Sequence, residues 1–192
     1  IFRASIALLL GTCITLASES GSFDRTLSVS GPVDLDVRSD PGGMVITAGS
    51  AETVRVRAVI KPLYGRFDLG LAEANIRALE QNPPIEQVGN RIRVGYVKDP
   101  ALLRGITMHI EIETPRATQA HAHTRSGGIR IDGIDGPAET ETLSGRTEIS
   151  NVVTEAKAAG HSGAIVIRGT GHVSVRNQSG GIQLLGIHGA VD

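Results

Sequence analysis

The last third of the chain repeats one short motif. Residues 124–132 read TRSGGIRID, residues 142–150 TLSGRTEIS, residues 160–168 GHSGAIVIR and residues 177–185 NQSGGIQLL. The Ser-Gly pairs therefore recur at intervals of 18, 18 and 17 residues. A period this short, with strand-forming residues in each copy, is typical of a β-solenoid whose coils stack on one another. We predict an all-β fold: a single-stranded right-handed β-helix with one short helix inserted in its N-terminal half.

Each Ser-Gly pair is followed by apolar residues two positions apart, which places them on one face of a strand. We expect this face to form the interior, with the core made of Ile129, Ile131, Ile149, Ile165, Ile167, Ile182 and Leu184. Small alternating residues further along, such as Ala156 and Ala158, predict a second strand in each coil. The structural turns are assigned to Ser126, Gly127, Ser144, Gly145, Ser162, Gly163, Ser179 and Gly180, because glycine tolerates the positive φ of tight corners.

The outward positions of neighbouring coils carry opposite charges. The predicted register places Arg130 beside Glu148, and Glu139 beside Lys157. Such exposed cross-strand pairs contribute only a few tenths of a kcal/mol each. We interpret them as a solvated face.

The composition predicts an aliphatic core and gives no support for a nucleic-acid partner. Of 192 residues 40% are hydrophobic, but only 3% are aromatic and there is no tryptophan. Nineteen basic residues oppose twenty acidic ones, for a net charge of −1. A balance so close to neutral favours neither nucleic acid nor an anionic membrane surface as partner.

The first residues have the pattern of a signal peptide. Arg3 precedes an apolar run from Ile6 to Leu16, and Ala17 provides a small-residue cleavage site. We predict a signal peptide at residues 1–17 and export to the periplasm, cell envelope or extracellular space; the alternative is a buried segment of the mature fold. Cys13, the only cysteine, follows Leu10-Gly11-Thr12, which resembles a lipoprotein acylation site only loosely. Because the chain lacks an initiator Met and stops partway through a repeat, we expect sequence to be missing at both ends.

The mature part, residues 18–192, is predicted to be one domain. Residues 23–115 should form irregular strands and contain a helix at about residues 70–81, where apolar and charged residues occupy opposite faces. Two strands at residues 85–88 and 91–97 should form a hairpin at Gly89-Asn90. Ile106 to Ile112 alternate as a further strand, and residues 116–192 should form the regular coils.

These features together resemble a known bacterial family. The run from Ile106 to Pro115, followed by Thr-x-Ser-Gly-Gly-Ile corners, resembles the bacterial putative-adhesin family of unknown function. The resemblance covers about residues 23–192 and implies an exported or envelope-associated single-stranded β-helix, with adhesion suggested by the family's name. It brings no catalytic motif. The helix-bearing insertion with Pro83-Pro84 departs from the family pattern.

Two groups of residues could bind metal ions. His121 and His123 alternate on one strand, so both imidazoles should point to one side, and His161 or Glu141 could supply a third ligand. Asp132 and Asp135 lie in a glycine-rich turn, as calcium ligands do in nonapeptide β-rolls, but the pair does not recur in the other copies. Polar surface and ordinary turns explain both groups more simply, so we predict no metal site and no cofactor.

The predicted function is that of a structural or binding module. No group of carboxylates is gathered by the repeat, and the serines occupy the corner of every copy, so we predict no catalytic residues. We expect an exported module of adhesin type that contacts a protein or glycan surface. The alternatives are a polymerising β-helix scaffold that self-associates at the solenoid ends, and a carbohydrate-active β-helix enzyme.

Overall fold

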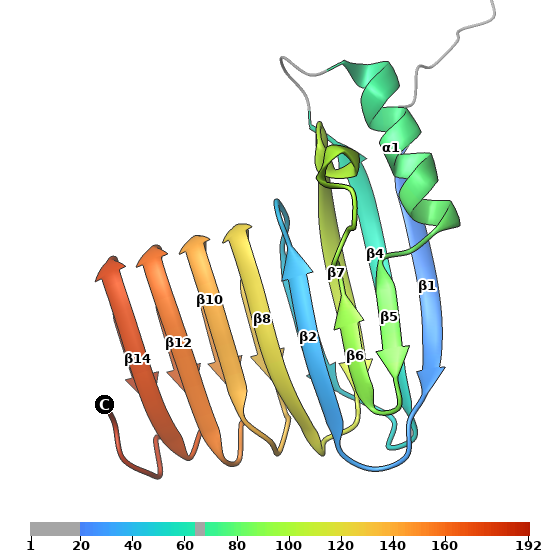
Figure 1. Cartoon of the computed structure of the whole chain (residues 1–192). Helices are drawn as coiled ribbons and strands as arrows, with labels where there is room; N and C mark the ends of the chain where they lie inside the picture. Colours follow the sequence, from blue (N-terminus) through green and yellow to red (C-terminus); the bar gives the residue numbers. More distant parts are fainter. Residues whose placement is uncertain (1–19, 64–67) are drawn as a thin grey trace, which may run out of the picture.

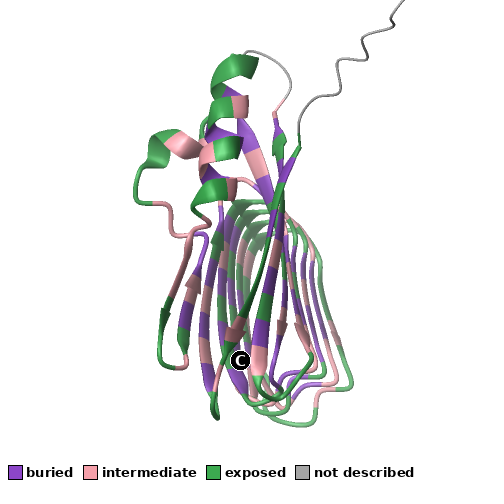
Figure 2. Cartoon of the chain, turned by 90° about the vertical axis from the view of Figure 1, so that its right-hand side faces the viewer, coloured by how far each residue is buried: buried purple, intermediate pink, exposed green. Residues whose placement is uncertain are grey.

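Two large β-sheets face each other and one helix packs beside them at one end (Figures 1 and 2). The structure is a computed structural model that describes residues 20–63 and 68–192. The predicted signal peptide at residues 1–17 and Cys13 lie outside the described residues.

Both sheets contain parallel and antiparallel pairs. Sheet A has eight strands in the spatial order β1 (Gly21–Ser28), β4 (Thr53–Pro62), β7 (Ile106–Thr114), β3 (Met44–Ala48), β9 (Ile129–Asp132), β11 (Thr147–Ser150), β13 (Ile165–Arg168) and β15 (Ile182–Leu185). Sheet B has seven, in the order β14 (His172–Ser179), β12 (Glu155–Ser162), β10 (Ala138–Ser144), β8 (Thr118–Ser126), β2 (Val33–Ser39), β6 (Arg91–Val94) and β5 (Ile85–Val88).

The prediction of a single-stranded β-helix is wrong, because the chain forms two mixed sheets. β1, β4 and β7 pair antiparallel, as do β5 and β6. The spatial order also departs from the sequence order: β3 lies between β7 and β9, and β2 lies between β8 and β6. The early strands β1 and β4, together with β7, form long antiparallel pairs that extend sheet A at the helix end (Figure 1). A period confined to residues 124–192 could not indicate those pairings.

The predicted eighteen-residue register is confirmed within the parallel strands. Ile131 pairs with Ile149, and Ile149 pairs with Ile167. All three side chains are fully buried, and each contributes on the order of 1.5–3 kcal/mol to stability. Buried and exposed residues alternate along the strands, so the core lies between the sheets (Figure 2).

The burial of the predicted core residues depends on their position in sheet A. Ile129 and Ile165 are buried like the three isoleucines above. Ile182 is exposed and Leu184 half-buried, because they belong to the outermost strand β15, which has a neighbour on one side only.

The Ser-Gly corners stack through backbone hydrogen bonds. Gly127 N donates to Ser144 O at 3.0 Å, Gly145 N to Ser162 O at 3.1 Å, and Gly163 N to Ser179 O at 3.1 Å. Gly145 has φ +153°, and a Cβ there would overlap the carbonyl oxygen of Gly127. Glycine is therefore required by close backbone approach as well as by the turn.

The helix and the hairpin were both predicted, and both are confirmed. α1 (Leu69–Gln81) begins at Asp68, whose carboxylate accepts from Gly70 N at 2.8 Å. Its apolar face, including Ile76 and Leu79, is buried, and it contacts β1, β4 and β7. β5 and β6 form the antiparallel hairpin, and a short 3₁₀ helix, η1 (Pro100–Leu103), precedes β7.

Candidate functional site

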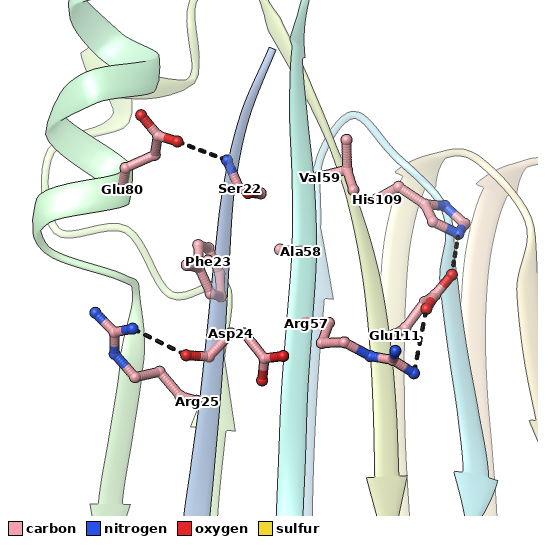
Figure 3. A pocket seen from close by; sticks show the side chains of 10 residues that line it. All are labelled: Ser22, Phe23, Asp24, Arg25, Arg57, Ala58, Val59, Glu80, His109 and Glu111. Carbon is pink, nitrogen blue, oxygen red and sulfur yellow. Dashed lines mark hydrogen bonds and ion pairs between the residues drawn. The ribbon is translucent and has the colours of Figure 1, made fainter.

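The outer face of sheet A has a concavity of about 590 Å³ beside α1 (Figure 3). It is lined by Ser22, Phe23, Asp24, Arg25, Arg57, Ala58, Val59, Glu80, His109 and Glu111. The strand pairing arranges the outward side chains in two rows. One row is Ser22, Val59 and His109, and the other is Asp24, Arg57 and Glu111.

Ion pairs fix the second row. Arg57 Nη2 lies 2.9 Å from Glu113 Oε1 and 3.7 Å from Glu111 Oε2. His109 Nε2 is 4.0 Å from Glu111 Oε1. That distance is beyond hydrogen-bond range, so Glu111 does not orient the imidazole as a general base would need.

Asp24, on β1, is the last residue of the same row. Arg55 contacts its two carboxylate oxygens with separate nitrogens, at 3.1 and 2.6 Å. This hydrogen-bonded guanidinium, together with its charge, holds the pKa of Asp24 below the usual value for an aspartate. The carboxylate is therefore ionised across the physiological range.

The helix forms one wall of the concavity. Glu80, in the last turn of α1, accepts a hydrogen bond from Ser22 N at 2.7 Å, and Arg25 donates to the carbonyl oxygen of Asp24 at 2.9 Å (Figure 3). Val59 is 42% exposed and provides an apolar position between the charged groups.

A second concavity, of about 430 Å³, adjoins the first and shares His109 with it. It is lined by Gly43, Met44, Val45, His109, Gly128, Ile129, Arg130, Arg146 and Glu148. Gly43 and Gly128 have no side chains, so the floor of this concavity is recessed at these two positions. We call the two concavities together the sheet A groove; it runs across the strands from β1 to β11.

The far end of this groove is cationic. Glu148 is hydrogen-bonded by Arg168, and Arg130 lies 3.9 Å away from it. Arg146 is exposed and forms no ion pair with any residue that the structure describes. The groove thus has charges of both signs near α1 and a positive excess near β11.

His121 and His123, the weak metal candidates, lie on the outer face of sheet B. His121 Nδ1 is 3.3 Å from Glu139, and His123 Nδ1 is 3.1 Å from Glu141. Each histidine thus pairs with a separate carboxylate, and His161 joins neither pair. Among residues 20–63 and 68–192, no three His, Cys, Asp or Glu side chains are close enough to hold a metal ion.

The other sequence candidates have protein partners. Asp132 accepts from Asn151 at 2.8 Å, and Asp135 pairs with Arg116 at 2.8 Å. Lys157 pairs with Glu155 at 3.1 Å on its own strand, although Glu139 is its register partner as predicted.

Sequence reasoning missed the sheet A groove. Some of its members come from strands more than 50 positions apart in the chain, such as Arg57 and Glu111, which pair across β4 and β7. The outward charged positions were visible as polar residues alternating with apolar ones. Nothing in that alternation indicated which strands would be neighbours.

The fold defines a class: a β-protein of two facing mixed sheets with a helix at one end. No family model matches the sequence, and no curated protein matches it. Among solved structures, one described as a "putative cell adhesion protein" from Clostridium sporogenes is similar, with a TM-score of 0.53 and 11% identity over 90% of this chain and 98% of that one. This likeness establishes the fold.

Two further structures were matched more weakly. A "putative adhesin" from Bacteroides fragilis has a TM-score of 0.34 and 12% identity, over 91% of this chain and 96% of that one. A "putative adhesin" from Parabacteroides merdae has a TM-score of 0.32 and 9% identity, over 89% and 95%. Within the described residues no helix has the length and apolarity needed to cross a membrane.

Proposed function

We propose that this chain is a non-catalytic binding module of an exported, adhesin-type protein, and that it holds its partner in the sheet A groove. The groove is the observation that carries the proposal. It is a concave surface with charges of both signs, built on strands whose backbones are fixed by sheet hydrogen bonds.

The groove is suited to binding an extended partner. It crosses several strands, and its charged groups lie beside one exposed apolar side chain, Val59. Arg146 and Arg130 offer donors at one end, whereas Glu80 and Asp24 offer acceptors near α1. A protein strand or a glycan chain lying across the strands would contact both ends.

The absence of catalysis is part of the proposal. Arg57 and Asp24 are engaged in ion pairs, and His109 is not oriented by a hydrogen bond from Glu111. The adhesion-related description of the similar Clostridium structure supports the same role. The signal-peptide pattern at residues 1–17 supports export.

The test is a printed array of defined glycans and purified extracellular-matrix proteins, probed with the wild-type chain and with His109→Ala. His109 lies where the two concavities join, so we expect the variant to bind each retained target about tenfold more weakly. His161→Ala is the matched control, because His161 is exposed on the outer face of sheet B. It should bind like the wild type.

Three results would contradict the proposal. Retention of no target would reject the binding role. Equal loss of binding in both histidine variants would reject the groove as its location. Cleavage of a bound glycan by the wild-type chain, detected by mass spectrometry of the array spots, would reject the non-catalytic assignment.

A further inference from the structure

A separate pocket of about 440 Å³ lies between residues near the ends of β2, β6 and β8 of sheet B and the segment of residues 95–103. It is lined by Arg38, Asp40, Glu86, Arg93, Gly95, Tyr96, Val97, Lys98, Pro100, Leu103, Met108 and Arg125. We call it the Tyr96 pocket. It shares no residue with the sheet A groove.

Close backbone packing fixes its wall. Gly95 has φ +83°, and a Cβ there would overlap the carbonyl oxygen of Arg38. The segment leading to Tyr96 therefore lies directly on the end of β2. The Tyr96 hydroxyl donates to Asp36 Oδ1 at 2.6 Å, which holds the ring in place.

Two of the four cations in the pocket have no carboxylate partner among the residues that the structure describes. Arg93 pairs with Glu86 at 3.2 Å, and Arg125 pairs with Asp40 at 2.7 Å. Arg38 and Lys98 form no ion pair with any described residue, although the Arg38 guanidinium lies 5.3 Å from the centre of the Tyr96 ring. The pocket therefore has two cationic groups available to an anion.

The remaining lining is apolar. Val97 and Leu103 pack against the core and are half-buried, and Met108, which also lines the pocket, is buried. A ligand that fills this space must present an apolar face next to its negative charge. Inorganic phosphate or sulfate has the charge but no such face.

We propose that the Tyr96 pocket binds the carboxylate-bearing ring of an acidic sugar within an anionic glycan. The sugar carboxylate would contact Arg38 and Lys98. The C–H face of the ring would pack on Val97, Leu103 and Pro100. Ring hydroxyls would donate to the carboxylates of Asp40 and Glu86, which keep acceptor capacity beside their arginine partners.

The experiment is isothermal titration calorimetry at low ionic strength, with trigalacturonic acid as the probe. The comparison ligand is the same trisaccharide with each carboxylate reduced to a hydroxymethyl group. We expect the reduced ligand to bind at least about tenfold more weakly, since it lacks the charge. Arg38→Gln and Lys98→Gln should each weaken binding of the acid about fivefold or more.

Arg91→Gln is the matched control. Arg91 lies on β6 beside the pocket residue Arg93, but it pairs with Asp34 outside the pocket and is 70% exposed. The affinity of the Arg91→Gln variant for trigalacturonic acid should stay within about twofold of the wild-type value. His161→Ala, in neither the Tyr96 pocket nor the sheet A groove, should likewise leave the affinity unchanged.

Several outcomes would overturn the inference. Equal affinity for the acidic and reduced trisaccharides would reject recognition of the carboxylate. Equal affinities of the Arg38, Lys98 and Arg91 variants would reject the location. Tighter binding of a hexaglutamate peptide than of trigalacturonic acid, lost in the Arg38 and Lys98 variants, would make the pocket a site for acidic peptides.

Discussion

Tyr96 is an aromatic residue whose surroundings constrain its chemistry. Burial and the hydrogen bond to Asp36 both raise the pKa of its phenol above 10.0, since each disfavours the phenolate. The Arg93 guanidinium lies 3.8 Å from the ring centre and adds a cation–π contact. The phenol is therefore a hydrogen-bond donor over the whole physiological range.

This arrangement predicts a pH effect that can be measured directly. The chain has two tyrosines, so Tyr64→Phe leaves Tyr96 as the only one that titrates. In that background Asp36→Asn should lower the pKa of Tyr96 toward 10.0, leaving the part of the shift that burial causes. Ultraviolet difference absorbance during an alkaline titration reports the change.

The sign of the effect on stability follows from the raised pKa. Tyr96 contributes stability that is fully present below the unfolded pKa near 10.0 and is lost as the pH rises through the folded pKa. Ionisation of Tyr96 at or below pH 10.0 in the protein with Asp36 intact would refute the role given to this hydrogen bond.

The face of the parallel strand on which a residue lies predicts how much its substitution changes stability. Ile149 is fully buried between Ile131 and Ile167, whereas Arg130 lies on the outer face. Ile149→Asp should remove about 4 kcal/mol or more of unfolding free energy, because it buries an unpartnered charge. Arg130→Ala should cost less than about 0.5 kcal/mol, because its ion pair at 3.9 Å is exposed.

Urea titrations followed by circular dichroism would measure both values. Ile149→Ala should fall between them, at about 2–4 kcal/mol, because it leaves a cavity without a charge. A larger loss for Arg130→Ala than for Ile149→Asp would reverse the assigned faces.

At the scale of the elements, the Ser-Gly corners hold the parallel strands in register. Gly127, Gly145 and Gly163 each donate to the serine carbonyl of the next corner, so one corner sets the position of its neighbour. Gly145→Ala should therefore destabilise the protein by about 2–4 kcal/mol, since it combines an unfavourable φ with overlap on Gly127.

Gly181 offers a matched control for this prediction. It follows Gly180 in the last Ser-Gly-Gly corner, has no positive φ, and a Cβ there would meet no atom within 4 Å. Gly181→Ala should change the unfolding free energy by no more than about 0.5 kcal/mol. Thermal melts that show equal effects of the two substitutions would contradict the close-approach argument.

At the scale of the whole molecule, the proposed binding role requires that the protein is exported. A module that contacts glycans or proteins outside the cell must first be exported, and residues 1–17 are the proposed signal. When the chain is expressed in bacteria, we expect its periplasmic form to begin at Ser18, after cleavage at Ala17. Intact-mass measurement of the periplasmic protein tests this, and recovery of uncleaved chain from the cytoplasm would refute it.

The whole molecule also shows where pattern-based prediction stops. The sequence pattern predicts irregular strands over residues 23–115 but not their neighbours in space. β3 pairs with β9 and β2 with β8, which joins the early strands to both sheets of the parallel region. Met44 and Leu35 are thereby buried in the same core as Ile131.

The sequence by itself determined the features that depend on local or periodic pattern. These are the inward face of each parallel strand, the seventeen- to eighteen-residue register, the glycine corners, the helix and the hairpin. Alternation and periodicity carry this information because they state which side chains share a face. Only the tertiary structure decided that β4 and β7 pair antiparallel, which brought Arg57 beside Glu111, and that β2 pairs with β6, which brought Tyr96 beside Arg38. The physical reason is that strands without a shared repeat choose neighbours by long-range packing and chain closure, which no local pattern specifies.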